Sequence, residues 1–254
     1  MSSLVTALRR PSTYTGQLRE VVTTARVAAM YPFGLVGAAL STGRPSGHEA
    51  HDTPVLLVHG YGHNRSGWFL LHQALRRAGF TSVHDMNYVA WGTAGVPQLA
   101  DRLAARVEAI LEVTGKDRIH LVGHSLGGVL VRWYVQELGG DEVVGTAVTI
   151  ASPHRGTTLA RLAPGPAARD LRPGSRVMRR LEADARPSAV RWVALYSNLD
   201  LLVQPGSSAR LDHPALDTTN VFVKDLGHLG LMMSPAVVRT VVEQLELAAP
   251  VQQV

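Results

Sequence analysis

Apolar residues recur along the chain in short blocks that alternate between two spacings. The run from Pro54 to Val58 is continuously apolar, as a strand buried on both faces requires. Between such runs, apolar residues return every three or four positions, the spacing of an amphipathic helix. This alternation predicts an α/β fold, a mostly parallel sheet with helices on both faces. The further strand-like runs are at 82–88, 118–122, 146–151, 191–196 and 220–223.

Helices are predicted where this spacing meets residues that start or end helices. One is expected from Ser66 to Arg77. A second opens at Pro97 and closes at Gly115, because proline suits a first helical turn and glycine the position after the last. A final helix starts at Pro235. The apolar side of the second helix consists of Leu99, Leu103, Val107, Ile110 and Leu111.

The first 50 residues have a different character. Residues 27–40 are almost entirely apolar or small, with Pro32 and Gly34 among them, and arginines precede them at 9, 10, 19 and 26. The stretch is too short for a confident membrane span and poorly placed for a signal peptide. We expect a helix kinked near Pro32 that packs on the protein or lies on a membrane surface. The sequence thus predicts a helical extension and linker over 1–50, a main domain over 51–254, and a cytoplasmic or peripherally membrane-associated protein. Secretion or anchoring is the less favoured alternative.

Composition narrows the classes of function. The chain has 254 residues, of which 46% are hydrophobic and 18% charged, so it can bury one large core. The net charge is +5, but the arginines are scattered and are not interleaved with aromatic residues, so no nucleic-acid partner is predicted. The absence of cysteine excludes disulfides, thiolate catalysis and cysteine-bound metals.

The peptide Gly123-His124-Ser125-Leu126-Gly127-Gly128 joins the strand-like run at 118–122 to a helix-like run at 129–135. A G-x-S-x-G peptide in this setting is typical of a nucleophile elbow, a sharp turn with an exposed serine hydroxyl at its tip. Its neighbours must be small, because side chains there would collide where strand meets helix. The pattern alone also arises by chance, so the strand–helix setting is what favours Ser125 as a nucleophile.

A serine hydroxyl needs a base within hydrogen-bond reach, usually a histidine that a carboxylate orients. In a parallel sheet these groups must follow the carboxyl ends of strands. Asp200 follows the strand at 191–196 and His228 follows the strand at 220–223. The order Ser, Asp, His along the chain suits this fold. We therefore predict His228 as the base and Asp200 as the acid, with Asp225 as the second candidate for the acid.

The loop His59-Gly60-Tyr61-Gly62-His63-Asn64 follows the first predicted strand. An oxyanion formed at the serine needs two preorganised N–H donors. We expect one from Leu126 and the other from this loop, where Tyr61 is the better candidate; a merely structural glycine turn is the alternative. His59 and His63 lack a carboxylate companion at helical spacing, so no metal site is predicted, and no cofactor is expected.

These segments together resemble α/β-hydrolases of the bacterial lipase group, close to the small Bacillus lipases and to lipase-like esterases of actinobacteria. The resemblance extends from about residue 54 to the C-terminal helix. It is carried by VLLVHGYGHN at 55–64, VTGKDRIHLVGHSLGG at 113–128, YSNLDLLV at 196–203 and GHLGLMMS at 227–234.

The resemblance implies an α/β-hydrolase fold in which Ser125, Asp200 and His228 form a catalytic triad, with Tyr61 and Leu126 as the oxyanion hole. It also implies hydrolysis of carboxylic esters of lipid-like substrates. Two departures qualify it: the first 50 residues have no counterpart in the compact secreted lipases, and the irregular stretch 153–188 is longer than theirs. We expect that stretch to be a small cap or binding loop. An acyltransferase or thioesterase, and a silent binding protein on the same fold, are the alternatives.

Overall fold

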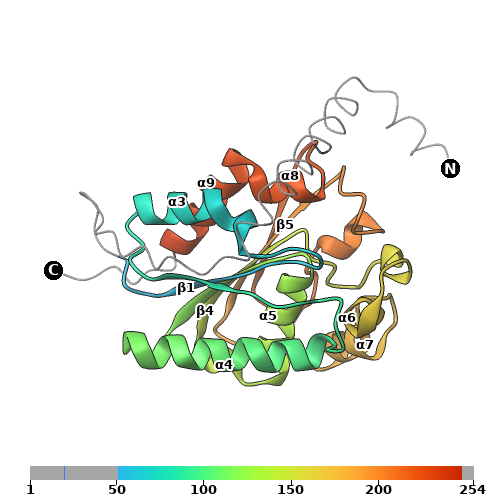
Figure 1. The fold of residues 1–254 in the computed structure, drawn as a ribbon, viewed down its shortest axis with the longest axis horizontal. Coiled ribbons are helices and arrows are strands. Elements are labelled where there is room, and N and C mark those ends of the chain that lie inside the picture. Colours follow the sequence, from blue (N-terminus) through green and yellow to red (C-terminus); the bar gives the residue numbers. More distant parts are fainter. Residues whose placement is uncertain (1–19, 21–50, 248–254) are drawn as a thin grey trace.

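The computed structural model describes Glu20 and residues 51–247, and Figure 1 shows a central sheet between two layers of helices. Within these residues six strands pair in parallel, in the order β2-β1-β3-β4-β5-β6. This arrangement confirms the predicted α/β-hydrolase architecture. The strands are β1 (Val55–Val58), β2 (Val83–Met86), β3 (Ile119–His124), β4 (Val144–Ile150), β5 (Arg191–Ser197) and β6 (Thr218–Val223).

The helices cover both faces of the sheet. In Figure 1, α3 (Phe69–Arg77), α8 (His228–Met233) and α9 (Pro235–Glu246) lie on one side, and α4 (Val96–Thr114) and α5 (Leu126–Glu137) lie on the other. Strand β1 serves both layers, because its side chains alternate in direction. Leu56 and Val58 belong to the core beneath α4 and α5, whereas Val55 and Leu57 belong to the core beneath α3 and α9. All four are fully buried, which explains the unbroken apolar run.

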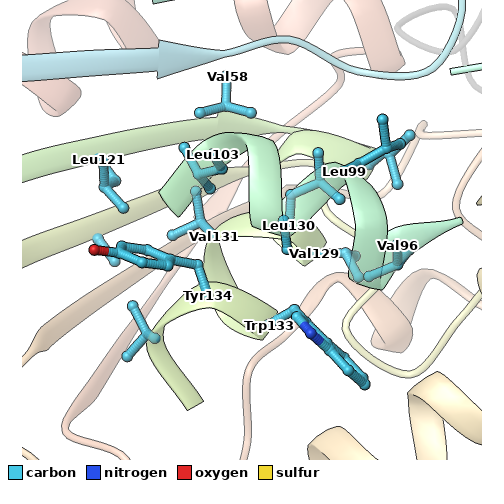
Figure 2. Close-up of a cluster of buried hydrophobic side chains, with 14 of the residues drawn as sticks. Val58, Val96, Leu99, Leu103, Leu121, Val129, Leu130, Val131, Trp133 and Tyr134 are labelled. Carbon is cyan, nitrogen blue, oxygen red and sulfur yellow. The ribbon is translucent and has the colours of Figure 1, made fainter. Parts of the chain in front are cut away.

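The larger of the two cores packs α4 and α5 against the sheet. Figure 2 shows Leu99 and Leu103 from α4 and Leu130 and Val131 from α5 gathered near Val58 of β1. Burying these side chains removes apolar surface from water, the main favourable contribution to folding. This core therefore fixes the helix that follows Ser125 relative to the strand that precedes it.

Helix ends follow the sequence signals closely, with one correction. Helix α4 contains Pro97 in its first turn and ends before Gly115, whose φ of 64° is the left-handed cap that glycine favours. The single helix expected over 66–77 is instead two pieces, a 3₁₀ helix η2 (Arg65–Trp68) and then α3. Asn64 caps η2 by accepting from the Ser66 amide, so the helical stretch begins one residue earlier than predicted.

The stretch 153–188, expected to be irregular, contains three short helices. They are η4 (Thr158–Arg161), α6 (Gly165–Asp170) and α7 (Arg176–Ala183), and α6 and α7 lie beside α4 and α5 in Figure 1. The predicted kinked helix over 27–40 lies outside the described residues. Among the residues that are described, no helix combines the length and apolar character needed to cross a membrane.

Candidate active site

Ser125 stands at the sharp turn between β3 and α5, as the elbow pattern predicted. Its φ of 55° and ψ of −122° fall where residues other than glycine are strained. The turn is held on both sides: the Ser125 amide donates to the Ile150 carbonyl at 2.9 Å, and the Gly128 amide donates to the Ser125 carbonyl at 3.1 Å. The surrounding structure thus holds this half-buried serine in an unfavourable backbone conformation.

Glycines around the serine are required by close backbone approach. A Cβ on Gly123 would lie 2.5 Å from the backbone nitrogen of Gly128, and one on Gly127 would overlap the Val58 carbonyl. Strand and helix meet too closely here for any side chain, which is the collision expected from the sequence.

Asp200 and His228 are brought together at the carboxyl ends of neighbouring strands β5 and β6. The Nδ1 atom of His228 lies 2.8 Å from Oδ2 of Asp200, and both side chains are buried. The other carboxylate oxygen of Asp200 accepts from the amides of Leu202 and Val203 at 2.9 and 3.0 Å. Because the carboxylate is acceptor-only, the histidine carries its proton on Nδ1 and presents Nε2 as the free base.

Asp225, the second candidate for the acid, makes other contacts. Its carboxylate accepts from the side-chain amide of Asn198 at 3.0 Å, and its backbone amide donates to the Asn198 oxygen at 2.8 Å. Its φ of 59° turns the chain between β6 and α8. Within the described part of the chain, the carboxylate that His228 contacts is that of Asp200. The geometry favours Asp200 over Asp225.

Two further histidine rings, those of His124 and His63, lie close to His228. The His124 ring lies 4.7 Å from the His228 ring, and its Nε2 is 3.3 Å from the His228 carbonyl oxygen. Burial, followed by the proximity of His228 and His63, holds the pKa of His124 well below its usual range. Burial, followed by the proximity of His228 and His59, lowers the pKa of His63 to about 4. Both rings are therefore neutral near pH 7, and His124 packs on the base, a role that sequence reasoning missed.

The loop after β1 lies directly against the elbow. A Cβ on Gly60 would come within 2.8 Å of the Ser125 Cβ, so the absence of a side chain lets the loop approach the serine. His59 stacks on Tyr88 with ring centroids 4.2 Å apart and accepts from the Tyr88 amide at 3.3 Å. Tyr61 follows Gly60 in this loop and therefore lies next to the elbow. Leu126 is the first residue of α5, where helix geometry leaves the N–H without an intrahelical partner.

The stretch 153–188 touches each part of this site. The Tyr61 hydroxyl donates to the Pro164 carbonyl at 2.6 Å, and the Thr157 hydroxyl donates to the Leu202 carbonyl at 2.7 Å. From α5, the buried Arg132 guanidinium donates to the carbonyls of His154 and Leu181 at 2.9 and 2.8 Å. These bonds tie the stretch to the loop at 59–64 (the oxyanion loop), to the loop at 198–204 after β5 (the acid loop) and to α5, the helix that follows Ser125.

Glu20 reaches the same region from the opposite end of the sequence. Its two carboxylate oxygens accept from the amides of Leu229 and Gly230, immediately after His228, at 2.7 and 2.9 Å. Sequence reasoning missed this residue. No group of three or more potential metal ligands occurs among the described residues, and His59 and His63 make the separate contacts given above.

Comparisons with known proteins agree with this geometry. Residues 53–180 match the model of a family described by its alpha/beta hydrolase fold. A triacylglycerol lipase of Vibrio cholerae is 34% identical over 119 residues, covering 44% of this chain and 36% of the lipase. One of Pseudarthrobacter phenanthrenivorans is 31% identical over 114 residues, covering 42% and 35%. The chain thus spans about a third of the length of these relatives, and the resemblance to bacterial lipases is confirmed.

Solved structures show the same fold. The mature lipase BlEst2 of Bacillus licheniformis superposes with a TM-score of 0.65 at 17% identity, covering 80% of this chain and 96% of that one. Lipase B of Aspergillus fumigatus gives a TM-score of 0.69 at 19% identity, covering 82% and 56%.

Proposed function

Since this chain belongs to the α/β-hydrolase family, we propose that it is a serine hydrolase that cleaves carboxylic esters of lipid-like substrates through an acyl-enzyme. The observation that carries this proposal is the buried Asp200–His228 pair, joined at 2.8 Å, beside the strained Ser125 elbow. A nucleophile, a base and a group that orients the base are the three parts that acyl transfer by serine needs.

In the first half of the reaction Ser125 Oγ attacks the carbonyl carbon of the ester while Nε2 of His228 takes the hydroxyl proton. Asp200 stabilises the imidazolium that forms. The amides of Tyr61 and Leu126 donate to the oxyanion of the tetrahedral intermediate. The bond to the alcohol oxygen then breaks, His228 returns the proton to that oxygen, and the acyl group stays on Ser125.

In the second half water attacks the acyl-enzyme. His228 removes a proton from the water, the same amides stabilise the second tetrahedral intermediate, and the Ser125 oxygen leaves with the proton that His228 returns. The neutral rings of His124 and His63 place no positive charge beside the imidazolium that forms at each step, since the pKa of each is lowered by burial.

An apolar acyl chain suits the surface around the acid loop. Leu201 and Leu202 follow Asp200 directly and are exposed, and Leu162 in the stretch 153–188 is 84% exposed. The amide of Thr158 donates to the Gln204 carbonyl at 2.9 Å, which brings this stretch alongside the acid loop. Exposed apolar side chains in and near the loop that carries the candidate acid favour substrates with a hydrocarbon chain over small polar esters.

Turnover of p-nitrophenyl esters of increasing chain length, alongside an emulsified triacylglycerol, tests the proposal. We expect hydrolysis with a preference for medium or long chains. An acyltransferase or thioesterase would instead favour an added alcohol over water, or a thioester over the matched ester. A silent binding protein would cleave none of these and would not react with a fluorophosphonate serine probe.

Replacement of Ser125 by alanine is the decisive variant. Loss of the nucleophile leaves only what the oxyanion hole and binding supply, so kcat should fall by about 10³-fold or more. Circular dichroism and the unfolding temperature should stay close to wild type, because the side chain is only half-buried and makes no hydrogen bond within the described residues. Turnover near the wild-type value in folded Ser125→Ala would refute the triad.

A further inference from the structure

The helix that begins with His228 has no cap of its own. Its N-cap is Gly227, which lacks a side chain that could accept from the first amides of α8. Helices leave these N–H groups without intrahelical partners, and an oxygen acceptor from a side chain normally satisfies them. In α8 the second and third residues are Leu229 and Gly230, and the acceptor for both is the carboxylate of Glu20.

The fit between Glu20 and α8 is close on every side. A Cβ on Gly227 would lie 2.6 Å from Cγ of Glu20, so a glycine at this position makes room for the carboxylate. A Cβ on Gly230 would lie 3.0 Å from Oε2. The two hydrogen bonds, at 2.7 and 2.9 Å, use both carboxylate oxygens, and bonds to a charged acceptor are stronger than neutral ones.

These bonds constrain the backbone that carries the proposed base. Asp200 holds the His228 ring at Nδ1, and His124 lies against the His228 carbonyl at 3.3 Å. Glu20 adds a third restraint, on the two amides that follow His228 in the chain. The orientation of the ring therefore depends on the start of α8 staying in place. A base displaced by about 1 Å can cost on the order of 10²-fold in rate.

We propose that Glu20 is a positioning residue for His228, so that a residue outside the matched 53–180 region completes the active site. This inference rests on the proposed function of Ser125 and His228. It assigns to Glu20 a part in turnover that does not depend on lipid.

Kinetics of two substitutions test the proposal on a soluble short-chain p-nitrophenyl ester. Glu20→Ala should lower kcat about tenfold or more and leave KM nearly unchanged, because the two hydrogen bonds of Glu20 act on the backbone after His228. Glu20→Gln should give an intermediate kcat, since one of the two acceptor oxygens becomes an NH2 group, a donor that faces a backbone N–H. Fluorophosphonate labelling should slow in the same order. Glu112→Gln, an exposed residue of α4 on the other side of the sheet, is the matched control and should behave as wild type.

The outcomes distinguish failure of the proposed function from failure of the role of Glu20. A wild-type protein that neither cleaves esters nor reacts with the probe defeats the proposed function itself. An active wild type with kcat within twofold in folded Glu20→Ala overturns the role of Glu20 alone. If the alanine variant does not fold, the nearly isosteric Glu20→Gln decides by the same twofold criterion. A rise in KM that accounts for the whole loss would place Glu20 in substrate binding and also overturn the proposal.

Discussion

At the scale of single residues, the site combines strain with burial. Ser125 keeps a backbone conformation that costs on the order of 1–3 kcal/mol in a residue other than glycine. Asp200 and His228 are buried, yet both carboxylate oxygens of Asp200 and Nδ1 of His228 have hydrogen-bond partners. Such arrangements are maintained only by the structure around them, and they concentrate at functional sites.

The two candidate acids can be separated by matched substitutions. Asp200→Asn should lower kcat by about 10²- to 10⁴-fold, because an amide that faces Nδ1 no longer fixes the tautomer of His228. Asp225→Asn should stay within a few-fold of wild type, since its carboxylate bonds Asn198 rather than the histidine. Steady-state kinetics on one soluble ester compares the two, and a larger loss in Asp225→Asn would reverse the assignment of the acid.

Buried histidines should make stability depend on pH. Burial lowers the pKa of His59 and of His120 to about 4, whereas the unfolded chain protonates both near 6.5. The unfolded state therefore binds more protons between these values, so stability is complete above about pH 6.5 and is lost as pH falls toward 4. Each histidine contributes about 3 kcal/mol to this loss.

Urea unfolding between pH 7 and pH 4.5 measures the effect, with His120→Asn as the matched variant. The asparagine oxygen can replace Nδ1 as acceptor for the Thr146 amide, a bond of 3.2 Å in the structure, but it does not titrate. Its free energy of unfolding should fall less steeply with decreasing pH. An identical slope in the two proteins would contradict the assignment of the loss to this histidine.

At the scale of elements, the arrangement follows largely from local patterns. The strands, α4 and the elbow were predictable because burial on both faces, helical spacing and end residues each leave a mark in the sequence. Helices α6 and α7 were missed because the prolines of 153–188 suggested an irregular chain. Pro166 in fact lies in the first turn of α6, a position that tolerates proline. With six residues, α8 is too short to show a helical period.

Site contacts between distant parts of the sequence were less predictable. The positions of Ser125, Asp200 and His228 relative to strand ends could be inferred, because parallel strands bring their carboxyl ends to one edge. Glu20 could not, since 209 residues separate it from Leu229 and a single glutamate in a polar context has no pattern. The packing of His124 on His228 likewise depends on where the chain between β6 and α8 turns, which Asp225 sets through its positive φ.

Arg132 should anchor the stretch 153–188 to α5. Arg132→Met removes the donor for the His154 carbonyl, and an unsatisfied buried carbonyl costs about 1–3 kcal/mol, whereas the Leu181 carbonyl still accepts from the side-chain amide of Gln136. We expect the free energy of unfolding to fall by about 1–3 kcal/mol. Hydrogen exchange of amides between 154 and 181 should accelerate. Arg102→Met, an exposed position on α4, is the control, and equal exchange in both variants would show that Arg132 does not hold the stretch.

At the scale of the whole molecule, we propose two units, an extension and linker over 1–50 and an α/β-hydrolase domain over 51–254. The apolar residues 27–40 and the arginines before them lie outside the described residues. Their composition favours reversible attachment to a membrane surface with anionic headgroups, weakened by salt. Packing of the same helix on the domain is the alternative.

Deletion of residues 1–45 should abolish sedimentation with anionic vesicles while the remaining domain stays folded. The deletion also removes Glu20, so turnover will fall for a second reason, and vesicle binding must be measured directly. Full-length Glu20→Ala is the matched control, because it lacks the carboxylate but retains residues 27–40. Equal vesicle binding with and without the segment would exclude attachment to lipid, and loss of folding would make the segment structural.

The parallel sheet also governs when the site can form during folding. Parallel neighbours cannot be joined by a tight hairpin, so each pairing closes a long loop of chain, and such distant contacts form slowly. His124 and His228 meet across 104 residues, and β4, β5 and β6 lie between them in the chain. Helix content and tryptophan burial can therefore recover in a refolding chain before the proposed ester hydrolysis does. The return of the proposed activity would mark the completed sheet, and a nascent chain that ends before residue 228 would lack the proposed base.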